Sequence, residues 1–215
     1  MSFPYKKFEI TMPSDGGVSI GMIAASRSGK TCLMKYIIKK HFAKHITYFC
    51  TMNSHAEIYD NIGKNCIVAN EYRPEILRDM HQMNSETKNK YNFLFVSDDY
   101  VDSKIKNDPE ITRALTIFRN CGLSSLFSMQ GRVLLSSVGR NQLNYILIGR
   151  QNTTAEYMNI VKEVLGGYLP NGLTMNEKVR FLIAAVQNHQ FIMLDTINGL
   201  CYLTKLSKEQ MAEIA

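Results

Sequence analysis

The chain has 215 residues, of which 45% are hydrophobic, and a formal net charge of +6 at pH 7. That length predicts one large domain, or one domain with a small appendage. The longest apolar run falls well short of the roughly 20 residues that a membrane-spanning helix needs, and residues 1–7 lack the apolar stretch of a signal peptide. We therefore expect a soluble, intracellular protein with no membrane span. The basic charge is compatible with a polyanionic partner, and equally with an ordinary soluble surface.

The cysteines and histidines show no pattern that binds a metal. The five cysteines are scattered and contain no C-x-x-C pair, and the five histidines contain no H-E-x-x-H spacing. Free, buried thiols in a reducing compartment are the simplest interpretation. This composition disfavours a zinc site.

In chain order, residues 1–16 are expected to form an N-terminal arm or edge strand before the turn Asp15-Gly16-Gly17. Residues 17–150 form the predicted nucleotide-binding core, where β-like runs alternate with helical patterns. The predicted strands are 18–23, 45–51, 66–69, 92–99, 123–129 and 145–148. The intervening segments 32–38, 56–62, 75–89 and 109–119 are predicted to be helical, and 134–142 to be helical or irregular. This alternation predicts an α/β fold with a mainly parallel central sheet.

The last part of the predicted single domain, residues 151–215, follows a different pattern. Segments 154–165 and 176–186 are predicted to be helices separated by the loop 166–172. Two β-like runs, 191–194 and 200–203, then flank Asn198-Gly199, which is a strong indication of a hairpin. We expect C-terminal helices followed by a β-hairpin.

The stretch Ala24-Ala25-Ser26-Arg27-Ser28-Gly29-Lys30-Thr31 lies between the first strand and its helix. It matches the P-loop pattern G-x-x-x-x-G-K-[ST] except at the first position, where Ala24 replaces glycine. The backbone N–H groups from Ala25 to Cys32 would bind a phosphate. Lys30 would reach the β- and γ-phosphates, and the Thr31 hydroxyl would bind Mg²⁺. A methyl group at Ala24 costs little if the turn keeps φ negative there. The alternative is a turn of small residues that only caps the helix.

The apolar run 92–99 ends in Asp98 and Asp99. Acidic residues at the carboxyl end of a central parallel strand lie beside the P-loop in an open α/β sheet. Side chains alternate along a strand, so one of the two carboxylates alone could face the nucleotide. Gln130 ends the next strand, where an amide can orient an attacking water, or where it only closes a turn.

The order Gly-Lys-Thr, Asp-Asp, Gln, Arg resembles the FtsK–HerA superfamily of P-loop motor ATPases. Within it, the sequence is most similar to the short genome-packaging ATPases of double-jelly-roll-capsid DNA viruses. The resemblance covers about residues 18–150 and rests on four stretches. These are 24–31, 94–99, 118–124 leading to Gln130, and Arg140-Asn141. The family usually has histidine after the arginine of the third stretch, where this chain has Asn120.

The resemblance implies a RecA-like P-loop NTPase fold with ATP and Mg²⁺ as cofactors. By position, Lys30 and Thr31 would bind phosphate and Mg²⁺. Asp98 would hold Mg²⁺ through water, and Asp99 would be the base that polarises the attacking water. Gln130 would sense the γ-phosphate or position that water.

Such motors form rings, here a pentamer or hexamer, in which a neighbour's arginine completes the site. Arg119 and Arg140 are the candidates, Arg150 is a third, and each could instead be a plain surface cation. Double-stranded DNA would be held by mobile basic loops, with Lys104 and Lys106 as the first candidates. Viral capsid or portal-vertex proteins are the other expected partners.

The leading hypothesis is an ATP-driven motor that packages double-stranded DNA into a preformed viral capsid. Its expected location is the host-cell cytoplasm or the virus assembly site, with the virion as an alternative. A P-loop nucleoside or nucleotide kinase remains a second hypothesis, although the chain shows no compact basic lid. A non-catalytic module that binds nucleotide and nucleic acid is the third.

Overall fold

The computed structural model describes residues 3–51, 59, 62, 65–99, 108–130 and 135–214. Among these residues, eight strands form one sheet in the order β3-β2-β4-β5-β1-β6-β7-β8. Neighbouring strands from β3 to β6 run parallel, whereas β7 and β8 are antiparallel to their neighbours and form a hairpin. The strands are β1 Ser19–Ile23, β2 Ile46–Thr51, β3 Cys66–Ala69, β4 Phe93–Asp98, β5 Leu123–Met129, β6 Tyr145–Ile148, β7 Phe191–Asp195 and β8 Leu200–Thr204. The predicted mainly parallel sheet with a C-terminal hairpin is confirmed.

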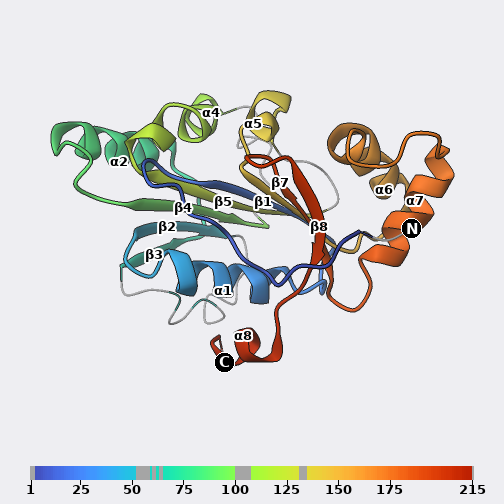
Figure 1. Cartoon of the computed structure of the whole chain (residues 1–215). Coiled ribbons are helices and arrows are strands. Elements are labelled where there is room, and N and C mark those ends of the chain that lie inside the picture. Colours follow the sequence, from blue (N-terminus) through green and yellow to red (C-terminus); the bar gives the residue numbers. More distant parts are fainter. Residues whose placement is uncertain are drawn as a thin grey trace.

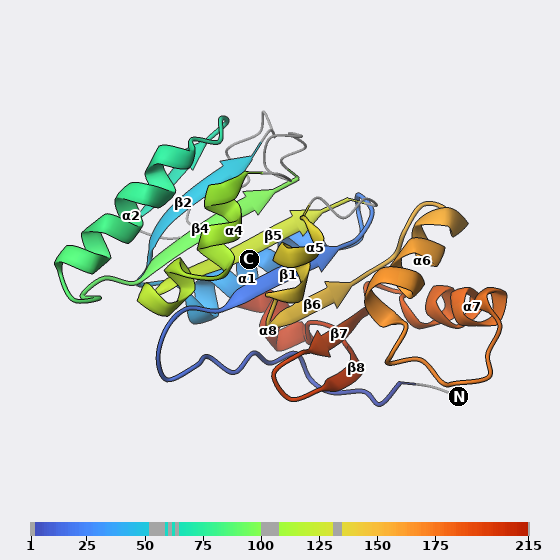
Figure 2. The same cartoon turned by 90° about the horizontal axis from the view of Figure 1, so that it is seen from above.

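Helices cover both faces of this sheet. Figure 1 shows α2, α4 and α5 on one face and α1 and α8 on the other, while α6 and α7 lie together at one end. The described helices are α1 Lys30–His41, α2 Pro74–Glu86, α4 Pro109–Leu115, α5 Ser137–Asn141, α6 Thr154–Ile160, α7 Met175–Ala185 and α8 Lys208–Ala212. A 3₁₀ helix, Phe118–Cys121, precedes β5, and a π-helical turn, Val161–Leu165, extends α6. The result is a three-layer α/β arrangement, which Figure 2 shows from above.

The apolar runs of the central strands follow from this double cover. Along β4, Phe93 and Phe95 belong to the hydrophobic cluster that includes residues of α2 and α4, whereas Leu94 and Val96 belong to the cluster that includes residues of α1. Every residue of β4 is buried. A strand covered on both faces needs apolar side chains at consecutive positions, which is why the sequence showed no alternation there.

Several predicted boundaries differ from the structure. The helix predicted over 109–119 ends at Leu115, and a separate 3₁₀ helix, Phe118–Cys121, follows it before Gly122, which has a left-handed φ of 81°. The helix predicted over 75–89 ends at Glu86, before the left-handed Lys88 and Asn89. The N-terminal arm pairs with β8 by one bridge, Tyr5 to Leu203. Helix α8 was not predicted, and the segment 56–62 lies outside the described residues except for Tyr59 and Ile62.

Candidate nucleotide-binding site

The P-loop leaves the carboxyl end of β1 between two neighbouring strands. Ala24 continues the strand pairing, since its N–H donates to the Met129 carbonyl (3.0 Å) and the next N–H donates to the Arg150 carbonyl (2.7 Å). Ala24 therefore keeps a negative φ, and the left-handed positions of the loop are Arg27 (58°) and Gly29 (96°). The methyl group of Ala24 has room because the adjacent residue is Gly149, where a Cβ would lie 2.9 Å from it.

Helix α1 begins at Lys30 without a side-chain cap on its first N–H groups. Gly29 occupies the cap position, and the first turn contains no acidic residue. The unpaired N–H groups and the positive end of the helix dipole favour an anion at this point. The strand, loop and helix thus have the arrangement that the sequence predicted and that a phosphate-binding loop requires.

Lys30 lies at the centre of the loop and is 5% exposed. Its Nζ donates hydrogen bonds to the carbonyl oxygens of Ala24 (2.5 Å) and Ala25 (3.3 Å) and lies 3.5 Å from Asp99 Oδ1. Burial lowers the pKa of the Lys30 ammonium, and the nearby carboxylates of Asp99 and Asp98 oppose that shift. The amine is therefore held in place before any ligand contacts it.

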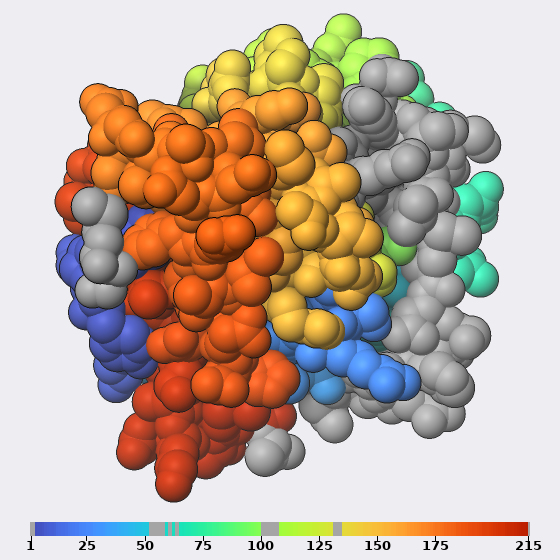
Figure 3. All heavy atoms as spheres, turned by 90° about the vertical axis from the view of Figure 1, so that its right-hand side faces the viewer, coloured from blue at the N-terminus to red at the C-terminus, as the bar shows by residue number. Residues whose placement is uncertain are grey.

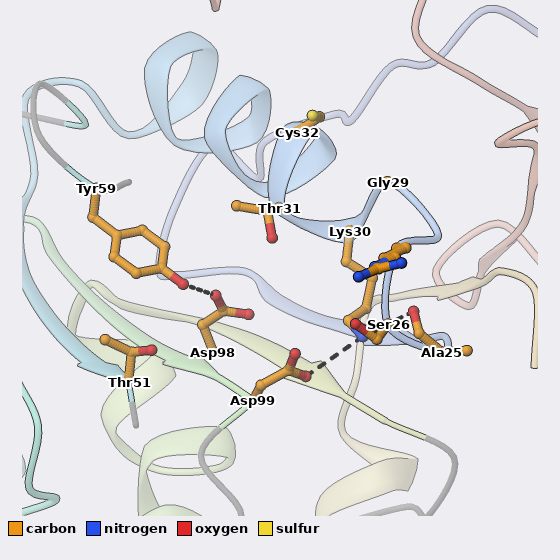
Figure 4. A pocket seen from close by; sticks show the side chains of 11 residues that line it. Ala25, Ser26, Gly29, Lys30, Thr31, Cys32, Thr51, Tyr59, Asp98 and Asp99 are labelled. Carbon is orange, nitrogen blue, oxygen red and sulfur yellow. Dashed lines mark hydrogen bonds and ion pairs between the residues drawn. The ribbon is translucent and has the colours of Figure 1, made fainter. Parts of the chain in front are cut away.

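The two carboxylates lie on the same cavity but in different environments (Figure 4). Asp98 is the last residue of β4, is 3% exposed and accepts a hydrogen bond from the Tyr59 hydroxyl. Burial raises the pKa of the Asp98 carboxyl, and the Tyr59 hydrogen bond opposes this. Asp99 is more exposed, contacts Lys30, and accepts a 2.6 Å hydrogen bond from Gln130 Nε2.

Both carboxylates line the cavity, so strand alternation does not turn one of them away from it. Strand alternation applies only within the strand, and β4 ends at Asp98. Asp99 has a left-handed φ of 46°, and its N–H donates to the Ser128 carbonyl (3.1 Å). This turn of the backbone brings the Asp99 side chain back to the cavity beside Asp98.

The cavity between the P-loop and the carboxylates has a volume of about 380 Å³. Its lining contains the Thr31 hydroxyl and the Asp98 carboxylate. These are hard oxygen donors of the kind Mg²⁺ prefers, and Mg²⁺ is commonly held by one or two carboxylates together with substrate phosphates. Within the described part of the chain, no group of three or more His, Cys, Asp and Glu residues could hold a metal without such phosphates. The donor set therefore fits a magnesium–nucleotide complex.

Comparison with protein-family models and with curated proteins finds no match. Several solved structures are similar. The DNA-packaging ATPase B204 from Sulfolobus Turreted Icosahedral Virus matches with a TM-score of 0.63 and 17% identity, covering 88% of this chain and 98% of that one. B204 from Sulfolobus turreted icosahedral virus 2, in complex with AMPPCP, matches with a TM-score of 0.62 and 18% identity over 91% and 100% of the two chains. EssC from Geobacillus thermodenitrificans matches with a TM-score of 0.62 and 10% identity over 94% and 44%.

The chain shares the α/β P-loop NTPase fold of these ATPases. The predicted fold thus agrees with the structural likeness. The TM-scores of 0.62 to 0.63 establish the shared fold. The P-loop NTPase fold also explains why the loop, Asp98, Asp99 and Gln130 meet, since they follow β1, β4 and β5, which are adjacent in the sheet.

The arginines lie away from this cavity or at its edge. Arg119 lies in the 3₁₀ helix at the amino end of β5, and its Nη1 donates to the Gln142 carbonyl (3.0 Å). Arg140 Nη2 forms an ion pair with Glu163 (2.9 Å). Arg150, in contrast, lies beside the chain's own P-loop, where its Nη2 donates to the Ser26 carbonyl (3.2 Å). Lys104 and Lys106 lie outside the described residues.

Tyr59 and Thr51 also line the cavity and had no motif to reveal them. Thr51 ends β2, the strand beside β4, so its position follows from strand order. Tyr59 comes from the connection between β2 and β3, and its ring packs on Phe49 with 4.5 Å between centroids. A threonine or a tyrosine in a sequence does not indicate a nucleotide site. The positions of Thr51 and Tyr59 at the cavity depend on which strands become neighbours in the sheet.

Proposed function

We propose that this chain is the subunit of an ATP-hydrolysing motor that moves double-stranded DNA into a preformed viral capsid. One observation carries the proposal: the connected side chains of Lys30, Asp99 and Gln130, beside Asp98 and Thr31 in one cavity. The phosphate-binding amine thus adjoins a pair of groups suited to orient water. The likeness to the B204 packaging ATPases, over nearly their full length, supports the choice of motor.

Each side chain has a distinct task in hydrolysis. The P-loop N–H groups and Lys30 bind the β- and γ-phosphates and stabilise the charge that develops on them. A magnesium ion held by Thr31 and Asp98 would neutralise further phosphate charge. Asp99 polarises a water that attacks the γ-phosphorus, and the bond to the bridging oxygen breaks to leave ADP and phosphate. Gln130, hydrogen-bonded to Asp99, keeps that carboxylate oriented and contacts the same water.

The decisive experiment measures ATP hydrolysis with and without double-stranded DNA, together with the mass of the assembly. The motor predicts a ring whose hydrolysis rate rises when DNA is added. Lys30→Ala protein, prepared in parallel, controls for contaminating ATPases. A monomer that transfers phosphate to a nucleoside would instead support the kinase hypothesis, and nucleotide binding without turnover would support the non-catalytic module.

The ring proposal requires a residue that acts across subunits. Arg119 and Arg140 remain the candidates, although each guanidinium is bonded within its own chain. To act on a neighbour, either side chain would have to exchange those bonds for contacts with the γ-phosphate. Mixing the alanine variant of one arginine with the Lys30→Ala variant should restore hydrolysis in mixed rings, because each supplies what the other lacks. No restoration in rings of confirmed composition would remove that arginine from the mechanism.

The remaining partners follow from the motor proposal. Double-stranded DNA is the proposed cargo, and capsid or portal-vertex proteins are the proposed docking partners. The net charge of +6 is favourable for a phosphate backbone. The motor would act in the host-cell cytoplasm, at the virus assembly site or on the virion. Among the described residues, no helix is both long and apolar enough to span a bilayer.

A further inference from the structure

The segment that follows β6 lies beside the start of the P-loop. The Gly149 N–H donates to the Ile23 carbonyl (3.0 Å), and Figure 3 shows this segment (amber) at the surface next to the P-loop region (blue). Gln151, its third residue, is 4% exposed and does not line the phosphate cavity. Burying a polar side chain is unfavourable unless it is hydrogen-bonded, so the contacts of this amide indicate its role.

The Gln151 side chain joins the carboxyl ends of two neighbouring strands. Its Nε2 donates to the carbonyl oxygen of Ile23, the last residue of β1 (3.0 Å), and to that of Gly149 (2.8 Å). Its main-chain N–H donates to the hydroxyl of Tyr157, a buried residue of α6 (3.0 Å). Within the part of the chain that the structure describes, its Oε1 is buried without a partner. The amide therefore acts as a donor to main-chain carbonyls.

These bonds fix the peptides from which the P-loop begins. The Ile23 carbonyl and the Ala24 N–H belong to one planar peptide, so the bond from the amide orients both. That N–H donates to the last carbonyl of β5 (3.0 Å), and the Ala25 N–H donates to the Arg150 carbonyl (2.7 Å). The carbonyl oxygens of Ala24 and Ala25 in turn accept from Lys30 Nζ, at 2.5 and 3.3 Å. The orientation of these first peptides therefore determines where the Lys30 ammonium lies.

We propose that Gln151 is a positioning residue for ATP hydrolysis, which acts on Lys30 by holding the peptide between Ile23 and Ala24. The pairing of the strands does not need this bond, because the Ile23 carbonyl already accepts from the Gly149 N–H. Loss of the amide should therefore loosen the loop more than the sheet. The inference rests on the proposed ATPase function and adds a residue outside the phosphate cavity that sets the geometry inside it.

The first test is Gln151→Met, which keeps the length of the side chain but donates no hydrogen bond. With a loosened loop, Lys30 should be less well placed for the charge that develops in the transition state. We expect kcat to fall about tenfold, a fraction of the roughly 10²-fold that a displacement of about 1 Å can cost. KM for ATP should change less than about threefold, because the N–H groups of the loop are still present to bind the phosphates. Steady-state hydrolysis over a range of ATP concentrations measures both.

Gln210→Met is the matched control. Gln210, on α8, is also buried (3% exposed) and donates two hydrogen bonds, to the Phe8 carbonyl (3.0 Å) and the Tyr36 hydroxyl (2.9 Å), but it does not line the phosphate cavity. Both variants should lower the unfolding temperature by a few degrees, and only Gln151→Met should lower kcat per folded molecule. Equal kcat values for the two variants would assign the Gln151 amide to stability alone and overturn the proposal. Failure of Gln151→Met to fold would overturn it too, because the sheet would then need the bond.

The second test is the pH dependence of Gln151→Glu. A protonated carboxyl can donate one hydrogen bond to the Ile23 carbonyl, whereas the ionised form donates none and repels that oxygen. Burial raises the pKa of such a carboxyl, so hydrolysis relative to wild type should be highest at the acid end of the range and fall as the pH rises. Gln151→Met gives the reference, because its ratio to wild type should not change with pH. A constant ratio for Gln151→Glu as well would show that the donor is not needed, and the proposal would be wrong. If wild-type protein does not hydrolyse ATP at all, the proposed function fails first and this inference fails with it.

Discussion

The two ends of the parallel strands both carry polar side chains, but they use them differently. At the carboxyl ends, Asp99 bonds to two other side chains, those of Lys30 and Gln130, although Lys30 also donates to the main-chain carbonyls of Ala24 and Ala25. At the amino ends, side chains bond to the main chain. There, Ser124 Oγ accepts from the Val18 N–H (3.1 Å), Asn144 Oδ1 accepts from the Ser19 N–H (2.9 Å), and Arg119 donates to the Gln142 carbonyl (3.0 Å).

This difference separates function from stability within one sheet. Bonds between side chains at the carboxyl edge can be exchanged for bonds to a ligand without leaving backbone groups unpaired. Bonds at the amino edge complete the backbone of neighbouring strands, and losing them exposes buried N–H and C=O groups at a cost. Substitutions at the first edge should therefore change turnover, and substitutions at the second should change the free energy of unfolding.

Lys30→Ala should have the largest effect of any single substitution. Removing the amine deletes a charge that contacts the β- and γ-phosphates, so we expect hydrolysis to fall at least about 10³-fold. The free energy of unfolding should change little, because the loss of the hydrogen bonds to the Ala24 and Ala25 carbonyls is offset by the removal of a buried charge. Steady-state hydrolysis and thermal unfolding measure the two quantities. Wild-type turnover in this variant would refute the proposed active site.

Asp99→Asn should lower hydrolysis by about 10²-fold, at the small end of the range for loss of a general base. The amide oxygen can still accept the hydrogen bond from Gln130, so the water stays oriented while its polarisation is lost. ATP should remain bound, which single-turnover quench experiments would detect. If Asp99→Asn has normal turnover and Asp98→Asn is inactive, Asp98 is the base and Asp99 takes the role of magnesium ligand.

Gly17→Ala tests the amino edge. A Cβ at Gly17 would lie 2.1 Å from the Leu123 carbonyl oxygen, so the backbone must shift. We expect a loss of about 1–3 kcal/mol in the free energy of unfolding, measured by denaturant titration, with unchanged turnover per folded molecule. Gly167→Ala is the matched control, because a Cβ there meets nothing within 4 Å. A stable but inactive Gly17 variant would contradict the division of the two edges.

Local sequence predicted the central strands and the P-loop because their patterns are contiguous. Residues 93–96 are apolar at consecutive positions because β4 is buried on both faces, and residues 24–31 contain the whole predicted phosphate-binding loop. What could not be predicted depends on tertiary packing. Tyr59 reaches Asp98 only because β2 and β4 are neighbours. The left-handed backbone of Asp99 and the short, polar helix α8 leave no periodic trace in the sequence.

Arg119→Ala tests whether an arginine at the amino edge contributes to stability or to catalysis. The family resemblance implies that Arg119 acts on a neighbouring subunit, whereas in this structure its side chain bonds to the main chain of its own subunit. Loss of its hydrogen bond to the Gln142 carbonyl should cost about 1–2 kcal/mol of unfolding free energy. Arg113→Ala, on an exposed arginine of α4, should cost less. Unfolding titrations compare the two variants. Full stability combined with a loss of hydrolysis that mixed rings restore would instead place Arg119 in the mechanism.

Tyr59→Phe should have the smallest effect of these substitutions. It should change only the Mg²⁺ concentration that hydrolysis requires. The ring that packs on Phe49 is kept, while the hydroxyl that donates to Asp98 is lost. Outer partners of metal ligands usually contribute 10–100-fold to metal affinity or activity. Asp98 is expected to contact Mg²⁺ through water, so we predict a rise of only about threefold in the Mg²⁺ concentration for half-maximal hydrolysis.

Magnesium titrations at saturating ATP would measure this shift, and Tyr202→Phe, a buried tyrosine of β8 remote from the cavity, is the control. An unchanged requirement for Mg²⁺ would mean that Tyr59 contributes only packing at the carboxyl edge. A lower requirement would mean that its hydroxyl competes with the ion for Asp98. In either case the hydrogen bond between Tyr59 and Asp98 would not prepare the carboxyl edge for its ligand. The proposed division between a functional carboxyl edge and a stabilising amino edge would then be weaker.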